Sequence, residues 1–495
     1  MVFGPAELDS LDALAGREWV ETDGLGSYAS STVAGIHTRR RHAWLAAAGR
    51  DGRTRALLAK FEEAAFVDGQ RHDLGANQYP DIVHPDGYRY LTGFRLDPWP
   101  VWTYHLDGAV IERHLALLHG TQTLVIGYHL LQADTAVSLE LRPLVAGRAV
   151  DQTRGENALF DRGVRSRGEQ LELVPYERQS RLVLSWPGAS FMSDGYWYYQ
   201  FQYRLDGARE DLFSPGLLLL TLHEGEQRLL AASTAPLDGL DLELALNLER
   251  DRRRRLAEAC VLPDDERAVR LALSADQFIR HSDRRNRVLP IWPDDPPARE
   301  ADVACFLLGL GSAAGRAELA MDLLGAEPVG LWTAWVAQRL GHGEELAPRV
   351  AEWVARVRSG DEPGLRETDL WLSSLDGDEL ETNALWRASL RLLGEDVTEL
   401  TAQLRARWSA DSSPLLLAEP DLLDDQQVRA CLVTPGADDA WHGACRALAA
   451  ARLGLSWPAP DLAPLREGLL GQVDDGRPDS LAGLLVWLAA ATDSV

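Results

Sequence analysis

The spacing of apolar residues changes near residue 250, and this change constrains the fold more than any other feature of the sequence. Before it, short apolar or alternating runs recur about every 8 to 12 residues, separated by Gly, Asp and Pro. The runs are 56–58, 102–105, 110–118, 123–131, 137–141, 170–174, 181–186, 197–203 and 217–222. This spacing is typical of an antiparallel β-sandwich, and we predict a β-sandwich domain over residues 1–255.

After Asp264 the apolar residues recur every three or four positions, which predicts helices. Twelve candidate helices begin near positions 264, 299, 315, 329, 346, 368, 380, 397, 425, 438, 462 and 479. Because twelve helices form six hairpins, residues 256–495 are predicted to form an all-α toroid of the (α/α)6 type. About 19 residues for each helix and its connector leave short loops, so this toroid is shortened. The charged stretch 248–255 between the two domains indicates a solvated linker or linker helix.

Composition limits the kind of partner and compartment. A chain of 495 residues needs more than one core, and a formal net charge of -25 disfavours nucleic acid and anionic membranes but not a neutral polysaccharide. The N-terminal segment lacks the basic and apolar regions of a leader, and no later stretch reaches ~18 uninterrupted apolar residues. We therefore expect a cytoplasmic protein. The four cysteines lack metal-like spacing, which favours buried reduced thiols.

Two residue counts are unusual. The chain has 16 Trp, whose flat apolar rings suit a protein core and also suit the apolar face of a pyranose; core packing is expected for most of them. Lys60 is the only lysine among 50 basic residues. Either a compact ammonium with three donors is required at this position, or one lysine has survived by chance among the arginines.

Residues 18–44 read EWVETDGLGSYASSTVAGIHTRRRHAW. Asp23, Gly24 and Gly26 predict a tight turn between two short strands, because these residues tolerate positive φ. The following small and hydroxylated residues, and then the arginines at 39–41, indicate a lined surface more than a buried core strand.

This run and several later blocks in the same order resemble the bacterial and archaeal glycogen debranching enzymes of the amylo-α-1,6-glucosidase type. The blocks are 57–62 (LLAKFE), 77–80 (NQYP), 84–94 (HPDGYRYLTGF), 98–104 (PWPVWTY) and 210–216 (EDLFSPG). The resemblance covers roughly residues 15–220 and is poor beyond them. It implies an N-terminal β-sandwich, a glucosidase-like toroid, a branched α-glucan substrate, hydrolysis of the α-1,6-linked stub, and no cofactor.

The catalytic carboxylates that the resemblance implies are altered. Inverting hydrolysis needs a carboxylic acid and a carboxylate roughly 6.5 to 9.5 Å apart. The family carries the first in a DWGRD segment soon after ADQF. This chain keeps ADQFI at 275–279 but has PPARE at 296–300, with Glu300 near the place of the aspartate and Trp292 at the preceding aromatic. Acidic substitutes nearby are Asp294, Asp295 and Asp302. The alternative is that these acids only favour a helix N-terminus.

The second carboxylate is replaced as well. Gln472 stands at the place of the family's glutamate and cannot accept a proton from water, whereas Asp474 or Asp475 would be a shifted substitute. A better-preserved block is 381–386 (ETNALW), whose Glu381 and Asn383 either face the toroid funnel as sugar ligands or belong to a helix N-terminus above a packed core.

Polar side chains in the predicted β domain are candidates for sugar contacts. They are Asp23, Arg39, Arg40, His42, Lys60, Asn77, Tyr79, His84 and Tyr88. The alternative is that they form the seam between the two domains. No histidine in this domain has the paired spacing of a metal site, so we expect no metal.

Three functions remain open. The first is a hydrolase that retains activity on a branched α-glucan, with Glu300 as acid and Asp474 or Asp475 as base. The second is a non-catalytic glucan-binding or regulatory homologue. The third is a structural role in a complex, which predicts an exposed apolar patch at the open end of the toroid.

Overall fold

The computed structural model describes the N-terminal half almost completely and the C-terminal half in part. The described residues are 2–4, 8, 10–49, 51–177, 180–260, 263–264, 266–281, 286–288, 303, 306–307, 309–311, 314–326, 340, 348–349 and 352. The chain divides into two compact units, Met1–Arg254 and Arg255–Val495.

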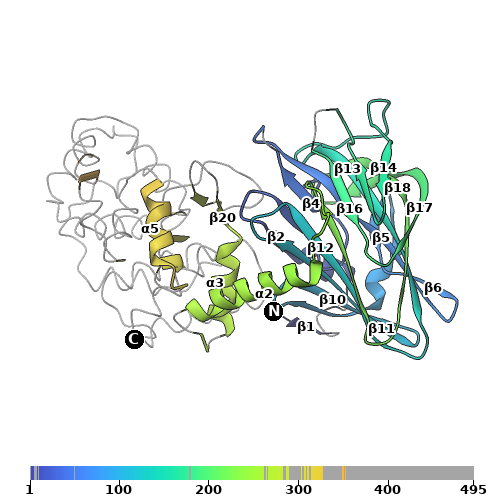
Figure 1. Ribbon diagram of the computed structural model, residues 1–495, viewed down its shortest axis with the longest axis horizontal. Helices are drawn as coiled ribbons and strands as arrows, with labels where there is room; N and C mark the ends of the chain where they lie inside the picture. Colours follow the sequence, from blue (N-terminus) through green and yellow to red (C-terminus); the bar gives the residue numbers. More distant parts are fainter. Residues whose placement is uncertain are drawn as a thin grey trace, which may run out of the picture. The chain divides into compact units, whose positions relative to one another are not determined.

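The first unit is a sandwich of two antiparallel sheets (Figure 1). One sheet has nine strands in the order β1 (Val2–Phe3), β9 (Leu91–Leu96), β10 (Pro100–Leu106), β11 (Ala109–Leu118), β12 (Thr123–Ala133), β19 (Gln227–Ser233), β16 (Leu182–Ser185), β15 (Gln170–Leu173) and β14 (Val164–Arg167). Its central pair, β11 and β12, aligns Leu115 with Ile126.

The other sheet has eight strands. Seven follow the order β17 (Ser190–Tyr203), β18 (Ala208–Leu222), β13 (Val137–Ala149), β5 (Thr54–Val67), β4 (Ala43–Ala48), β3 (Tyr28–Thr32) and β2 (Glu18–Thr22), and β6 (Gln70–Asp73) also pairs with β5. The hairpin of β7 (Ala76–Tyr79) and β8 (Ile82–Asp86), followed by a 3₁₀ helix at Gly87–Tyr90, lies beside β17. All nine runs predicted as strands fall on strands, so the predicted antiparallel β-sandwich is confirmed.

The core lies between the two sheets and includes one buried ion pair. Apolar side chains from both sheets, such as Leu115 and Phe61, form a single cluster. Inside it Arg113 of β11 donates to Glu63 of β5, and Tyr128 donates to the other oxygen of Glu63 at 2.5 Å. The Arg113 guanidinium also lies 4.2 Å from the centre of the Trp102 ring. Because every charge has a partner, the polar group is tolerated at the centre of the fold.

The predicted turn at Asp23 is present. Strands β2 and β3 pair antiparallel on either side of it, and Gly24 has a φ of 71°. The positive φ favours glycine here, and a Cβ on Gly24 would lie 2.5 Å from Nε2 of His119, so that a larger residue would also have to displace this ring. The prediction that the following residues form a lined surface is wrong for β3, which is buried along its whole length. Its small residues fit closely packed positions within the sheet.

Helix α2 (Leu242–Ala259) confirms the linker-helix alternative for residues 248–255, but the segment is not solvated. Leu242 and Leu246 pack on the outer face of the nine-stranded sheet with residues such as Trp99 and Val125. One and two turns further along, Glu249 and Arg253 are also buried. These four positions follow the spacing of one helix face, so the charged segment is anchored and not solvated.

The remaining described elements are short. Helix α1 (Leu11–Gly16) begins at Ser10, whose hydroxyl accepts from the amide of Ala13. In the second unit, α3 (Glu266–Asp276) and α5 (Ala317–Ala326) begin close to the predicted starts at 264 and 315, and β20 (Ile279–Arg280) pairs with β21 (Arg287–Val288). The helix starts predicted from 329 onward lie outside the described helices. In the described part of the chain, no helix is long and apolar enough to cross a membrane.

Candidate functional site

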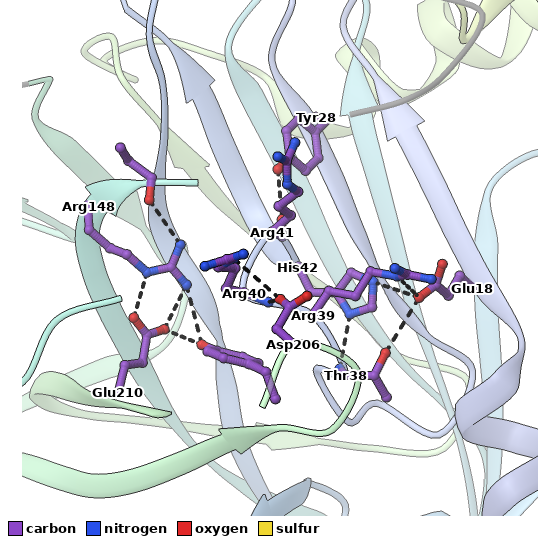
Figure 2. Close-up of polar contacts among 12 residues, drawn as sticks. Glu18, Tyr28, Thr38, Arg39, Arg40, Arg41, His42, Arg148, Asp206 and Glu210 are labelled. Carbon is purple, nitrogen blue, oxygen red and sulfur yellow. Dashed lines mark hydrogen bonds and ion pairs between the residues drawn. The ribbon is translucent and has the colours of Figure 1, made fainter. Parts of the chain in front are cut away.

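Glu18, the first residue of β2, is the common partner of three polar side chains in the segment that joins β3 to β4. Its Oε1 accepts from Nε of Arg39 at 2.7 Å, lies 3.3 Å from Nε2 of His42, and is 3.5 Å from the Thr38 hydroxyl. Figure 2 shows Arg39 and His42 both directed at this carboxylate. The backbone amide of Thr38 donates to Nδ1 of His42 at 3.2 Å, so Nε2 is the ring nitrogen that faces Glu18.

The electrostatics of Glu18 keep it ionised. Burial alone would raise its pKa, but the hydrogen bonds and charges of His42 and Arg39 outweigh burial and lower the pKa to about 2. A carboxylate with so low a pKa cannot act as a general acid near neutral pH. Its role is to orient Arg39, whose side chain remains 45% exposed.

Arg40 is held by the turn between β17 and β18. Its backbone amide donates to Oδ2 of Asp206 at 2.6 Å, and its Nε lies 3.7 Å from the same oxygen. The amide of Leu205 donates to the carbonyl of Thr38 at 2.9 Å. The Arg40 side chain is 42% exposed, so two guanidinium groups, Arg39 and Arg40, reach solvent from one braced segment.

Figure 2 shows a second buried ion pair to one side of Arg40, between Arg148 and Glu210. Arg148 of β13 donates from Nε and Nη2 to Glu210 of β18 at 2.5 and 2.8 Å, and Tyr203 also donates to Glu210. Burial would lower the pKa of Arg148, but the charge of Glu210 raises it above its usual value, so the pair stays ionised. This fork-on-fork pair ties β13, β17 and β18 together behind the arginine segment.

Lys60, the only lysine of the sequence, lies on strand β5 of the same eight-stranded sheet. It is 3% exposed, and its Nζ donates to the carbonyls of Gly35 and Ala76, each at 2.8 Å. Burial lowers its pKa to about 8. The two carbonyls belong to separate segments that converge on one small cation, which is the arrangement that favours an ammonium over a planar guanidinium.

A small pocket adjoins Lys60, with a volume of about 10 Å³, which is room for roughly one water molecule. Its lining residues are His37, Lys60, Asn77, Gln78, Phe201, Gln202, Tyr203 and Leu212. Burial, and then the positive charge of Lys60, lower the pKa of His37 well below its usual value. His37 Nε2 is buried and has no hydrogen-bond partner among the described residues. The His37 and His42 rings lie 5.7 Å apart, so the pocket lies next to the side chains gathered at Glu18. We call the set that runs from Glu18, Arg39, Arg40 and His42 through Lys60 to Asn77 and Tyr79 the polar row.

Asn77 and Tyr79 of β7 lie at the far end of this row. The side chain of Asn77 donates to Oε2 of Glu62, two residues after Lys60 on β5. Burial raises the pKa of Glu62, against the opposing effects of Lys60 and Asn77. The half-buried Tyr79 ring packs 5.1 Å from the ring of Phe201.

The other predicted sugar contacts of this domain lie apart from the row. Asp23 is fully buried, and its Oδ1 accepts from the amides of Leu25 and Ser27 at 2.7 and 2.9 Å, so it closes the turn. His84 is exposed on β8, and Tyr88 packs in the 3₁₀ helix against the core. The row therefore brings together Arg39, Arg40, His42, Lys60, Asn77 and Tyr79 of the predicted set.

The predicted residues of the second unit lie outside the described residues. They are Trp292, Glu300, Glu381, Asn383, Asp474 and Asp475. Within the described ranges, no group of three or more His, Cys, Asp or Glu side chains is arranged to hold a metal ion.

Several residues of the row were not predicted. Glu18 and Glu62 each stood at the edge of a block that the sequence singled out, and Glu210 opens another, so a search for carboxylates at block ends would have found them. Asp206 and Arg148 carried no such signal, because their roles depend on strand pairing. The row thus has exposed, braced guanidinium groups at one end and a buried ammonium and side-chain amide at the other.

Comparison with known proteins supplies the family of the first unit. Residues 17–229 match the family model for the N-terminal part of glycogen debranching enzymes. No curated protein matches the chain.

Two solved structures are weakly similar. A bacterial glucoamylase complexed with acarbose has 9% identity and a TM-score of 0.33, over 96% of this chain and 66% of that one. A GH92 α-mannosidase from Bacteroides thetaiotaomicron has 10% identity and a TM-score of 0.20, over 95% of this chain and 61% of that one. The chain thus spans less than two thirds of either structure, and scores this low carry no inference about its activity.

Proposed function

We propose, from the premise that residues 17–229 form a glycogen debranching enzyme N-terminal domain, that this protein recognises branched α-glucans. The observation that carries the proposal is the polar row of this domain. Arg39 and Arg40 present hydrogen-bond donors to solvent from a segment braced by Glu18 and Asp206. Sugar hydroxyls are good acceptors for such fixed donors, and the formal net charge of -25 does not oppose a neutral ligand.

Residues 256–495 are proposed to form the shortened (α/α)6-type toroid that accompanies such a domain, in a cytoplasmic protein. Two activities are compatible with it. In the first, Glu300 protonates the leaving oxygen of the α-1,6-linked stub and Asp474 or Asp475 activates water. In the second, the protein binds glucan without cleaving it. The second is favoured by Gln472, which stands where the family carries a carboxylate and which cannot serve as a base.

Glucose release from a branched limit dextrin distinguishes these activities. The purified full-length protein is compared with a Glu300→Gln variant, and binding to the same dextrin is measured in parallel. We expect binding of the dextrin without release of glucose. Release that is lost in Glu300→Gln would establish the hydrolase instead, and release that persists in that variant would assign the acid to another residue. Absence of both binding and release would overturn α-glucan recognition.

A further inference from the structure

The small pocket beside Lys60 is built by five separate parts of the β-sandwich. The segment between β3 and β4 contributes His37, β5 contributes Lys60, β7 contributes Asn77 and Gln78, and β17 and β18 complete the wall. His37, Lys60 and Asn77 are more than nine-tenths buried, whereas Gln78 and Gln202 are half-buried and lie at the side nearer to solvent. A volume of about 10 Å³ admits one atom of the size of an oxygen.

Several polar groups that line the pocket are already bonded to the protein. The side chain of Asn77 donates to Glu62. The amide of the Gln78 side chain donates to two backbone carbonyls at 2.6 and 3.1 Å, and its oxygen accepts from an arginine at 2.7 Å. The hydroxyl of Tyr203 donates to Glu210. These three side chains fix the shape of the pocket, and their bonds hold them in place.

Lys60 and His37 differ from these side chains, because each has bonding capacity left. The ammonium of Lys60 has three N–H groups, of which two donate to the carbonyls of Gly35 and Ala76; no described residue accepts the third. Nε2 of His37 is buried and likewise has no partner in the described part of the chain. Both side chains border the same pocket. Because a buried polar atom without a partner is costly, one bound atom that serves both groups is favoured.

The charges around the pocket select a neutral ligand atom. Burial lowers the pKa of Lys60 to about 8, and the charges of Glu62 and Glu63 oppose the shift. These carboxylates balance the ammonium and would repel an anion, while the ammonium itself would repel a cation. Burial also lowers the pKa of His37 well below its usual value, so its ring is neutral. A hydroxyl oxygen fits both groups, because it can accept from the ammonium and also bond to the imidazole.

We propose that this pocket binds one neutral hydroxyl oxygen, held between Nζ of Lys60 and Nε2 of His37. Water occupies the site in the free protein, and a hydroxyl group of a bound glucan has the same bonding capacity and can replace it. The inference deepens the proposed function at the buried end of the polar row. Only the glucan as a source of the oxygen rests on that function; the oxygen site itself rests on the pocket and its two groups.

The single lysine makes a direct test possible. Full-length protein labelled with ¹³C at the lysine Cε gives one NMR signal, and its titration reports the pKa of Lys60. We expect His37→Phe to lower this pKa by about one pH unit, because the larger ring displaces the oxygen and the third N–H loses its acceptor. His37→Gln can still bond to the oxygen and should stay within about 0.3 pH units of the wild type.

The matched control is His105→Phe, which makes the same substitution at an exposed position on β10 of the other sheet and should leave the pKa of Lys60 unchanged. Thermal melting of each variant verifies the fold. A high-resolution crystal structure of the wild type needs no variant. We expect it to show one oxygen within hydrogen-bond distance of both Nζ of Lys60 and Nε2 of His37.

Saturation with maltoheptaose, followed by the same signal and by calorimetry, separates the two sources of the oxygen. A Lys60 signal that moves in the wild type but not in His37→Phe identifies a glucan hydroxyl, whereas an unmoved signal despite measured binding identifies water alone; both retain the site. Lack of the oxygen in the crystal, or an unchanged Lys60 pKa in His37→Phe, would overturn the site even if maltoheptaose binds. Failure to bind maltoheptaose, with the oxygen present, would overturn the proposed function alone.

Discussion

Asp23 closes the turn between β2 and β3 with one oxygen paired and the other buried without a partner among the described residues. Burial raises its pKa from 3.8 to about 6, although the amides of Leu25 and Ser27 oppose the shift. The folded protein therefore holds this proton more tightly than the unfolded chain. Its favourable contribution is complete below pH 3.8 and is lost as the pH rises through about 6.

We predict that Asp23→Asn removes this pH dependence. The amide oxygen can still accept from Leu25 and Ser27, but the side chain no longer ionises. Between pH 4 and pH 7 the wild type should lose about 2 kcal/mol of unfolding free energy relative to the variant. Urea unfolding of both proteins at several pH values measures the difference, in which titration of other groups cancels. A difference that stays constant across this range would contradict the prediction.

Lys60 shows how far residue-level prediction reaches. Its singularity is visible in the sequence, and a requirement for a compact ammonium was one of two explanations. The two carbonyls that it joins lie 25 and 16 residues away, in segments whose approach depends on the packing of β7 against the sheet. Composition can therefore identify the residue but not its partners.

At the scale of elements, an ion pair with strand β2 attaches helix α2 to the β-sandwich. Arg253 donates to both carboxylate oxygens of Glu21 on β2 and, from Nε, to Glu249 one turn earlier at 2.8 Å. All three side chains are buried. Burial raises the pKa of Glu21 against the opposing charge of Arg253, so removal of the arginine would leave the Glu21 carboxylate buried without its ion-pair partner, whereas Glu249 would keep its pair with Arg252.

We predict that Arg253→Ala lowers the unfolding free energy of the β-sandwich by about 3 to 5 kcal/mol. The matched control is Arg254→Ala on the same helix, because Arg254 is 65% exposed and its ion pair with Asp251 is at the surface; its effect should stay within about 0.5 kcal/mol. Urea unfolding and hydrogen exchange of the α2 amides measure both. Equal effects of the two substitutions would show that α2 is not anchored through Arg253.

The strands and this helix differ in how well sequence predicted them. Strands such as β11 and β12 are apolar runs between turn residues, a pattern that predicts strands, and the predictions for both are confirmed. The sequence predicts a surface for the buried strand β3 because Ala29 is small and Ser30 and Ser31 are small and hydroxylated, and only packing reveals that such residues fill tight positions. A helix at residues 248–255 was one of two predicted alternatives, but the burial of its charged residues was not predicted, since Glu21, the partner of Arg253, lies 232 residues away in the sequence.

At the scale of the whole molecule, the formal net charge of -25 separates two kinds of ligand. An anionic ligand would have to approach Arg39 and Arg40 through a repulsive field, and its binding would change strongly with salt. A neutral glucan would gain hydrogen bonds from these side chains, and such bonds to an uncharged ligand depend little on ionic strength. Salt dependence therefore tests the chemical class of ligand independently of any single residue.

We predict that the affinity of the full-length protein for maltoheptaose changes by less than about two-fold between roughly 50 and 500 mM NaCl, while its thermal stability rises as self-repulsion is screened. Heparin, a polyanionic polysaccharide, is the matched control and should not compete. Titration calorimetry and thermal melting over the same salt series provide both measurements. Affinity that falls steeply with salt, or displacement of maltoheptaose by heparin, would mean that the exposed arginines recognise a charged ligand, and the neutral glucan would then be the wrong class.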